Sequence, residues 1–543
     1  MLLFGIGVVL LVAGGFASLA LGKNAGTASA VAILGAVGGC ALALVDAVQV
    51  LLSGQPVEAA VSWQIPLGNF AVGLDALSAV FVVPIALVVA LAAIYGGQYL
   101  RGSHEARRVA VSWFFFNFLG ATMLLVVAAR NAVLFLICWE GMSLASFFLV
   151  NGQHERDDVR RAGWVYLVAM HLGSACLLVL FLLLGRGSGS LDFDRLSAEP
   201  HLAGAMFLLA LAGFGTKAGM VPLHVWLPEA HPAAPSHVSA VMSGVMIKTG
   251  IYGLARTLCI LGEIPAWWGW TLVAVGILSG ILGVLLALAQ HDLKRLLAYH
   301  SVENIGIICL GLGVGALGVS YGIAGMALLG FLGAILHVIN HALFKSLLFL
   351  GAGAVQHATG TRDMDRLGGL LKVMPRTGTT FLIGACAISG LPPLNGFVSE
   401  FLIYLAVLGG VTEAGHSSGH AWAVLCVLTF GGLALIGGLA AACFAKAFGS
   451  VFLGEPRSEE ARRGHEAGRA MGIPMAILAA ACVIVALSAP IWPIVLRPAA
   501  TAIASAVPPE HLDAASRSAV ILSSSQRSLE AALPNIMGET ICQ

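Results

Sequence analysis

Lysine, glutamate and histidine recur inside the long apolar stretches of this 543-residue chain, where they could take up and release protons. Burial disfavours the charged form of such a group and a nearby opposite charge restores it, so a small displacement can decide whether it holds a proton. A charged side chain within a bilayer costs about 2.5–3.5 kcal/mol on insertion scales and is expected to serve a function. A series of these groups would suit ion translocation, with protons as the expected ion.

The candidate residues fall on successive apolar segments. Those expected to form a proton pathway are Glu140, Lys217, His237, Lys248, His337, His341, Lys345 and Glu400, and three further candidates are His171, Glu303 and Lys446. The spacing of four residues from His337 to His341, and from His341 to Lys345, places all three on one face of a helix. The set as a whole indicates proton transfer more strongly than any one member.

Several candidates also have a plainer interpretation. Glu140 and Lys217 could form a purely structural ion pair, and any single histidine could be a hydrogen-bonded core residue. Lys446 is placed near a helix end and could extend to the membrane surface. His337 and His341 could bind a metal ion, although no third ligand stands at a suitable spacing.

Four further residues are expected near the membrane surface. Glu229 and His231 stand among prolines, either where protons enter or in an ordinary loop. Lys294 and Arg295 are interpreted as loop charges and not as members of the pathway.

Composition places most of the chain away from water. Hydrophobic residues make up 59% and charged residues 10%, whereas soluble domains carry about 25% charge. The net charge of +1 comes with arginines spread over many loops, so nucleic-acid binding is not expected. None of the 10 cysteines forms a CxxC pair, so neither an iron–sulfur cluster nor a zinc site is expected. With no HExxH sequence and no Walker phosphate loop, the chain is not expected to be an enzyme on its own.

Apolar segments of about 20 residues are long enough to span a bilayer as helices. Fourteen spans are expected, with approximate bounds 2–22, 28–53, 74–99, 109–129, 131–151, 161–185, 202–221, 237–262, 267–290, 296–318, 322–356, 379–411, 421–453 and 471–496.

Basic residues gather in the loops that follow the odd-numbered spans. These loops hold Arg101, Arg107, Arg108, Arg156, Arg160, Arg161, Lys294, Arg295, Arg362, Arg366, Lys372, Arg376, Arg457, Arg462, Arg463 and Arg469, and the opposite loops hold Arg130, Arg186, Arg195 and Arg256. Because positive charge is retained on the cytoplasmic side, the odd-numbered loops are expected there and both termini outside.

Prolines interrupt two of the expected spans. Span 7 is broken near Pro222 and Pro228, and span 12 at Pro392 and Pro393. Broken helices are tolerated at membrane depth where they line a cavity or pack within protein. If spans 4–8 and 9–13 are two five-helix units, both breaks fall on the fourth helix, and the odd number of spans makes the units inverted repeats.

The expected fold is an all-α integral membrane protein of about 14 transmembrane helices, with broken helices 7 and 12. Residues 1–108 would form helices 1–3, residues 109–262 the first unit and residues 263–454 the second unit. Residues 455–543 would hold the last span and a polar tail.

Four long motifs resemble the proton-translocating antiporter-like membrane subunits of respiratory complex I and its relatives. They are FGTKAGMVPLHVWLPEAHPAAPSHVSAVMSGVMIKTGIYGLAR at 214–256, HDLKRLLAYHSVENIG at 291–306, HVINHALFKSLLFLGAGAV at 337–355 and LPPLNGFVSEFL at 391–402. The likeness extends from about Asp75 to about Pro456. Within HPAAPSHVSAVMSGVMIKTGIYG, LLAYHSVENIG and HATGTRDMDRLGGL, the chain is similar to the large membrane subunit of group 4 nickel-iron hydrogenases, including hydrogenase-4 and formate hydrogenlyase.

The resemblance implies a role for six residues. Glu140 corresponds to a gating glutamate paired with Lys217 on the broken seventh helix. Lys248 corresponds to the lysine of the central axis on helix 8, and Lys345 to the central lysine of helix 11, with His341 beside it. Glu400 corresponds to a terminal position on helix 12 that is lysine in some members of the family and glutamate in others.

The resemblance also implies a setting. The chain would be a multi-pass subunit of a bacterial or archaeal inner membrane, joined to other membrane subunits and to a peripheral, hydrogenase-like redox arm. It would hold no cofactor itself, and a nickel-iron centre and iron–sulfur clusters would lie in partner subunits. Since some relatives carry a long lateral helix and this chain ends at Gln543, an extended lateral arm is not expected.

Two other functions fit the general pattern. The chain could be a subunit of a multisubunit sodium/proton antiporter or of an inorganic carbon transporter, driven by an existing gradient. It could also be a structural anchor whose charges hold partner subunits, which a row of charges through both units makes the weakest of the three.

Overall fold

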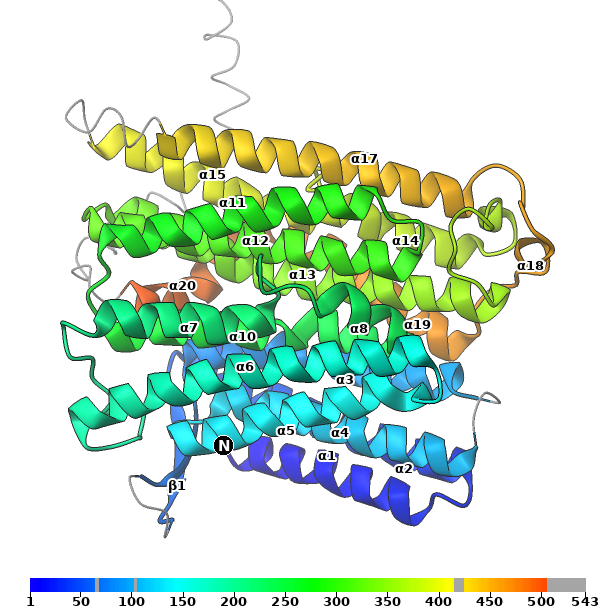
Figure 1. Ribbon diagram of the computed structural model, residues 1–543, viewed down its shortest axis with the longest axis horizontal. Helices are drawn as coiled ribbons and strands as arrows, with labels where there is room; N and C mark the ends of the chain where they lie inside the picture. The colour runs from blue at the N-terminus through cyan, green and yellow to red at the C-terminus, as the bar shows by residue number, and fades with distance from the viewer. Residues whose placement is uncertain (64–67, 102–104, 415–423, 505–543) are drawn as a thin grey trace, which may run out of the picture.

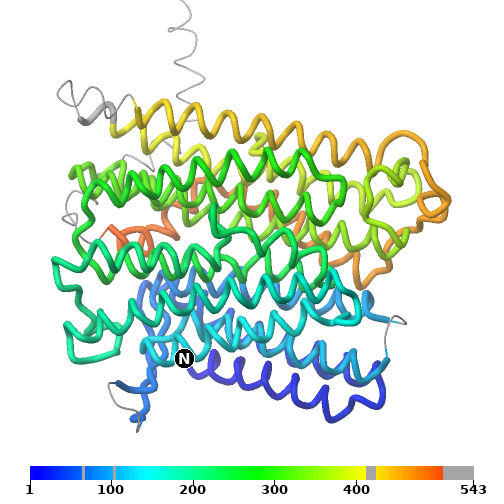
Figure 2. The backbone as a smooth tube through the Cα atoms, viewed as in Figure 1, coloured from blue at the N-terminus to red at the C-terminus, as the bar shows by residue number. Residues whose placement is uncertain are grey.

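The apolar composition dictates a helical architecture, because a chain in a bilayer must satisfy its backbone hydrogen bonds internally. The computed structural model describes residues 1–63, 68–101, 105–414 and 424–504. Twelve of the described helices are long and apolar enough to cross a membrane. They lie side by side along one common direction (Figure 1), and the backbone path runs back and forth between the two ends of this bundle (Figure 2).

Three helices and a small hairpin make up the N-terminal part. Their bounds are α1 Leu2–Ala20, α2 Ala25–Ser53, β1 Val57–Val61, β2 Phe70–Leu74 and α3 Ala76–Tyr99. Asn24 begins α2 by accepting hydrogen bonds from the backbone of Gly26 and Thr27. Glycines allow α1 and α2 to approach closely, since a Cβ added at Gly35 would lie 2.9 Å from the Cα of Gly14.

The hairpin departs from the all-helical expectation. β1 and β2 pair antiparallel with Val57 opposite Leu74. Hydropathy alone missed them because five-residue strands are far shorter than a span. Asp75 follows β2, caps α3 and forms ion pairs with Arg130 and Arg256 at 3.2 and 2.7 Å. Burial alone would raise the pKa of Asp75, but Arg256 and then Arg130 hold it well below its usual range.

Residues 109–262, the predicted first unit, correspond to α4–α10. The bounds are α4 Ala106–Ala128, α5 Ala132–Val150, the short 3₁₀ helix η1 Asn151–Gln153, α6 Asp157–Ser188, α7 Ala203–Ala218, α8 Leu227–Ala233, α9 Ser236–Val241, the π-helical turn η2 Met242–Met246 and α10 Lys248–Leu261. Helix α7 ends at Gly219, whose positive φ of 81° starts the irregular stretch that leads to α8.

Residues 263–454, the predicted second unit, correspond to α11–α17. The bounds are α11 Ala266–Leu288, α12 Leu293–Ser320, α13 Ala324–Thr359, the 3₁₀ helix η3 Leu370–Lys372, α14 Pro375–Ile388, α15 Asn395–Ala414, the π-helical turn η5 Val427–Gly431 and α17 Gly432–Phe452. Each predicted unit thus has a broken fourth helix and a π-helical turn in its fifth, and the inverted repeat itself stays a prediction.

The C-terminal helices return to the middle of the bundle. They are α18 Glu459–Arg462, α19 Arg469–Leu487, the 3₁₀ helix η6 Ala489–Ile491 and α20 Trp492–Ile503. Both α19 and α20 pack against α3 and α13. The 36-residue α13 is the central helix, in contact with α3, α9, α12, α14 and α15 as well.

The helices match the predicted spans with two exceptions. Twelve of the fourteen segments contain a helix that is long and apolar enough to cross a membrane. Segment 202–221 is built from the 16-residue α7, and segment 379–411 is divided between α14 and α15. The two breaks are therefore confirmed, and the count of fourteen spans stays a prediction. Most of the predicted polar tail lies outside the described residues.

Candidate functional site

Lys217 lies in the last turn of α7, directly before the helix breaks. Its Nζ donates to the Ser143 hydroxyl at 2.7 Å and lies 3.2 Å from the Met170 sulfur. The rings of Trp139 and Tyr166 stand 5.3 and 5.8 Å away, within range of a cation–π attraction. Neutral partners and aromatic faces therefore surround this buried ammonium.

Glu140 and His171 lie on the outer face of α5 and α6. Their side chains are 34% and 55% exposed, and His171 Nε2 is 3.9 Å from Glu140 Oε2. The expected contact between Glu140 and Lys217 is not an ion pair among the described residues, since Lys217 bonds Ser143 one turn further along α5. One carboxylate oxygen of Glu140 is nevertheless buried and has no hydrogen-bond partner there.

Lys248 opens α10 immediately after the π-helical turn. Its buried Nζ donates to the backbone carbonyl of Ser243 in that turn. The Ser243 hydroxyl in turn meets that of Ser301 on α12 at 2.8 Å. The π-turn therefore places Lys248 where the two predicted units meet.

His237 occupies an aromatic pocket on α9. Its ring centre lies 5.5 to 5.9 Å from those of Phe116, Tyr99 and Trp113. Neither ring nitrogen has a hydrogen-bond partner in the part of the chain that the structure describes. His237 is thus buried and surrounded by aromatic rings.

Lys345 and His341 lie in the middle of α13 and are fully buried. Neither Lys345 Nζ nor either His341 nitrogen has a hydrogen-bond partner among the described side chains and backbone. Lys345 faces the Phe349 ring at 5.8 Å, and the rings of His341 and His337 stack with centres 6.5 Å apart. Most buried polar groups bond either to protein or to ordered water, so these three nitrogen atoms are free to accept water as a partner.

A hydrogen-bonded network joins α12, α13 and α15. Asn304 Nδ2 donates to Glu303 at 2.9 Å, and Asn304 Oδ1 lies 3.1 Å from His337 Nε2. Because an amide oxygen only accepts, His337 Nε2 carries the hydrogen. His337 Nδ1 then meets the Ser399 hydroxyl at 2.9 Å, and His300 contacts the Glu303 carboxylate. The network connects a buried carboxylate to two imidazoles.

Glu400 follows the break of the twelfth predicted span, next to this network. It is buried on α15, and its carboxylate lies against Gly390 in the break. A Cβ at Gly390 would come within 3.0 Å of both carboxylate oxygens, so the glycine makes room for the charge. Asn340 holds the other side of the break by donating to the Asn395 carbonyl at 2.6 Å.

Lys446 has a different surrounding. Its Nζ donates to the carbonyls of Leu288 and Gln290 at 2.8 and 2.9 Å, at the end of α11. A lysine that satisfies the last carbonyls of a helix is a capping residue, which favours the structural interpretation of Lys446.

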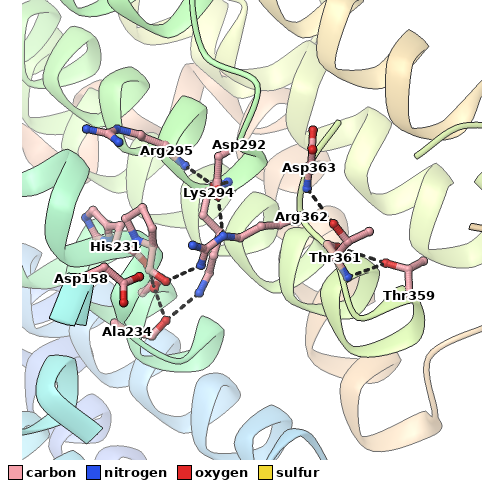
Figure 3. A network of polar contacts seen from close by, with 12 residues as sticks. Asp158, His231, Ala234, Asp292, Lys294, Arg295, Thr359, Thr361, Arg362 and Asp363 are labelled. Carbon is pink, nitrogen blue, oxygen red and sulfur yellow. Dashed lines mark hydrogen bonds and ion pairs between the residues drawn. The ribbon is translucent and has the colours of Figure 1, made fainter. Parts of the chain in front are cut away.

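Lys294 was expected among loop charges, and that expectation was wrong. Asp292 caps α12 by accepting from the backbone of Lys294 and Arg295, which turns Lys294 inward in the first helical turn. Its Nζ is buried and donates to the Ala234 carbonyl at 2.6 Å, below the buried His231, as Figure 3 shows. Arg295 faces outward and pairs with Glu229.

Sequence reasoning overlooked several members of these clusters. His300, Asn304, Asn340 and Ser399 were not singled out, and Lys294 was set aside. The sequence did contain a signal for His300, because residues three apart on a helix are neighbours and His300 precedes Glu303 by three residues. Ser399 and Asn340 gave none, since small polar residues are common in spans.

Charged and imidazole groups thus run through α7, α10, α13 and α15. We call Lys217, Lys248, His341, Lys345 and Glu400 the charged row. Such groups can take up and release protons, and the described residues hold no cluster of three His, Cys, Asp or Glu side chains that could bind a metal ion.

Comparison with known proteins finds a matching family and two similar membrane subunits. The family described as "NADH:quinone oxidoreductase/Mrp antiporter, TM" matches residues 129–426. Hydrogenase-4 component B of Escherichia coli (strain K12) is 46% identical over 422 residues, 77% of this chain and 62% of that protein. Formate hydrogenlyase subunit 3 of the same organism is 35% identical over 455 residues, 82% of this chain and 72% of that protein.

A solved structure shares the fold. The Mrp complex from Dietzia sp. DQ12-45-1b superposes with a TM-score of 0.77 at 22% identity, over 95% of this chain and 98% of the chain compared. The present chain spans less than two thirds of the length of hydrogenase-4 component B.

Proposed function

The chain belongs to the NADH:quinone oxidoreductase/Mrp antiporter membrane family, and on this premise we propose that it is the proton-translocating membrane subunit of a redox-driven complex of the hydrogenase-4 or formate hydrogenlyase type. Lys217 gates the proton, Lys248 and Lys345 with His341 relay it, and Glu400 releases it. The likeness to component B of hydrogenase-4 favours this complex.

One observation carries the proposal: three lysines are buried at membrane depth, and none of them forms an ion pair with a carboxylate in the described part of the chain. Lys217, Lys248 and Lys345 contact a hydroxyl, a backbone carbonyl and an aromatic ring respectively. A buried ion without a counter-charge is costly, and the group can lower that cost by giving up its proton. A proton relay requires groups that can give up a proton in this way. A structural ion pair would stabilise the charged lysine and so hold the proton in place.

The outer face of α5 and α6 supports the presence of a partner. Glu140 and His171 are half exposed on helices that cross the membrane. Since an ionisable group facing lipid is costly, a neighbouring membrane subunit is the expected cover. A partner that moves against Glu140 would change the field at Lys217, which provides a route from partner chemistry to the charged row.

The remaining parts of the complex lie outside this chain. A nickel-iron centre and iron–sulfur clusters would belong to partner subunits and a peripheral redox arm, so the chain acts as the translocating subunit of an oxidoreductase and not as an enzyme by itself. Its place is the inner membrane of a bacterium or archaeon.

Gradient-driven sodium/proton exchange is the second candidate. The matching family includes Mrp antiporters, and the fold is shared with an Mrp complex. In this case the same charged row would serve a partner that handles sodium instead of electrons.

The deciding experiment isolates the tagged chain with its partners from native membranes and measures proton uptake in vesicles. The variant is Lys217→Ala, and the matched control is Lys23→Ala on the exposed loop between α1 and α2. We expect co-purification of a nickel-iron hydrogenase module, and redox-driven uptake that Lys217→Ala abolishes with the assembly intact.

Two results would contradict the first proposal. Isolation without redox subunits, together with sodium-dependent uptake, would favour the antiporter. Unchanged uptake in Lys217→Ala within an intact complex would remove the gating role of that residue.

A further inference from the structure

A cavity of about 730 Å³ opens at the basic end of the bundle, between the first turns of α4 and α6, the end of α5 and the α8–α9 junction. It lies apart from the outer face that carries Glu140 and His171. Its charged lining is strongly unequal: Arg107, Arg108, Arg156, Arg160, Lys294 and Arg362 contribute to the wall, against Glu105 alone.

Four arginines of this wall pair with carboxylates, and the exposed pairs can yield to a new anion. Arg160 pairs with Asp157 in the exposed loop, whereas the pair of Arg362 with Asp292 is mostly buried. Arg108 pairs with Glu155 and Arg156 with Asp158, with every one of these side chains about half exposed. Exposed pairs of this kind stabilise a protein by only about 0–1 kcal/mol, so an anion can displace them at little cost. Arg107 has no ion-pair partner in the described part of the chain. Arginine binds phosphate with two parallel hydrogen bonds, which is stronger than a single contact.

The opposite side of the cavity is apolar and open toward the lipid. Trp164 on α6 and Phe148 on α5 are 65% and 48% exposed and contribute to the lining. Phe115 on α4 stacks on Phe148 with ring centres 4.5 Å apart. A tryptophan at the junction of a span and a basic loop is typical of the membrane–water interface. A ligand that satisfies both sides must therefore join an anionic head to an apolar chain.

We propose that this cavity binds the phosphate headgroup of an anionic phospholipid from the cytoplasmic leaflet, with its acyl chains along the outer surface of α4, α5 and α6. Basic pockets between helices on the cytoplasmic side bind such headgroups. A soluble phosphate would use the arginines but would leave the exposed rings uncovered. Because Lys294 forms part of the floor, the bound phosphate lies near the buried polar groups around His231.

The test uses the full chain in neutral detergent, with native mass spectrometry to count bound phosphatidylglycerol and phosphatidylcholine. The variant is Arg107→Gln with Arg156→Gln. The matched control is Arg376→Gln with Arg463→Gln, which removes the same charge from exposed positions on the same side, in the first turn of α14 and directly after α18, away from the cavity. Each arginine near an anionic lipid contributes a factor of about five in affinity, so the double variant should weaken phosphatidylglycerol binding about 30-fold. The control should leave it unchanged.

A second variant, Trp164→Ala, examines the apolar side. It should weaken both lipids to a similar extent, because the ring contacts the chain and not the head. If the cavity variant and the control lose phosphatidylglycerol binding equally, the proposal is overturned, because binding would then depend only on the overall charge of the protein. Displacement of the lipid by inorganic phosphate at equal concentration would assign the site to a soluble anion. Loss of the lipid on assembly of the complex would assign it to a partner chain.

Discussion

The two predicted units carry a glutamate and a histidine at corresponding places, and the structure gives the two pairs opposite surroundings. In the first unit, Glu140 and His171 lie on the outer face of α5 and α6 and are 34% and 55% exposed. In the second unit, Glu303 and His337 are fully buried between α12, α13 and α15. His337 is held there by two hydrogen bonds, whereas the pair in the first unit faces outward.

This difference in exposure assigns different expected tasks to the two pairs, namely response to a partner in the first unit and internal proton transfer in the second. Glu303 and His337 are enclosed by their own chain, and the polar groups that contact them include Asn304 of α12 and Ser399 of α15. Glu140 is placed to respond to a neighbour while one of its oxygens stays buried near the α7 break. Under the proposed function, the first unit would receive an input from outside the chain, and the second would transfer protons within it.

The largest effect is expected at the centre of the second unit. Lys345→Met should reduce proton uptake in vesicles to background, because it removes the ammonium at the middle of the charged row. Its thermal unfolding temperature should stay equal or rise, since a buried charge without a protein partner is replaced by an apolar chain.

The control for this variant is Lys446→Met. Its ammonium caps α11, so we expect a lower unfolding temperature with uptake retained. The opposite assignment, with uptake lost only in Lys446→Met, would move the pathway away from α13.

The next largest effect is expected in the free energy of unfolding, which should distinguish His337 from His171. His337→Leu leaves Asn304 Oδ1 and Ser399 Oγ without this partner and should lower the free energy of unfolding by about 2 kcal/mol. His171→Leu on the outer face should change it by less than about 0.5 kcal/mol. Denaturant titration of the purified chain in micelles measures both. Equal losses would show that His171 is also held inside the chain.

A hydrophobic carbodiimide, which reacts with membrane carboxyl groups, tests the same contrast through access. In the purified chain we expect labelling of Glu140 and little of Glu303, read by peptide mass spectrometry. In the assembled complex the label at Glu140 should fall, because a partner covers the outer face. Labelling of Glu140 that is the same in both preparations would contradict a partner at that face.

The sequence was a good guide to what lies in the membrane and a poorer guide to which way each side chain turns. The apolar runs predicted the helical bundle, and the prolines after Lys217 and before Glu400 predicted both breaks. Hydropathy measures length and composition, so it could not reveal that Asp292 caps α12 and turns Lys294 inward. It also could not distinguish Glu140 from Glu303, since the environment of each depends on packing between helices far apart in sequence.

The smallest predicted effect concerns how the first unit holds its lysine. Ser143→Ala removes the 2.7 Å acceptor of Lys217 Nζ but leaves the Met170 sulfur and the Trp139 ring in place. A lost hydrogen bond to a charged group costs about 1.5 kcal/mol, so the uptake rate should fall about tenfold without being abolished. Ser146→Ala is the matched control, one turn further on α5, where the hydroxyl contacts Tyr166 and not Lys217. If Ser143→Ala and Ser146→Ala reduce uptake equally, the serine contact does not set the state of Lys217. The input from the outer face would then have to reach the charged row through Glu140 alone.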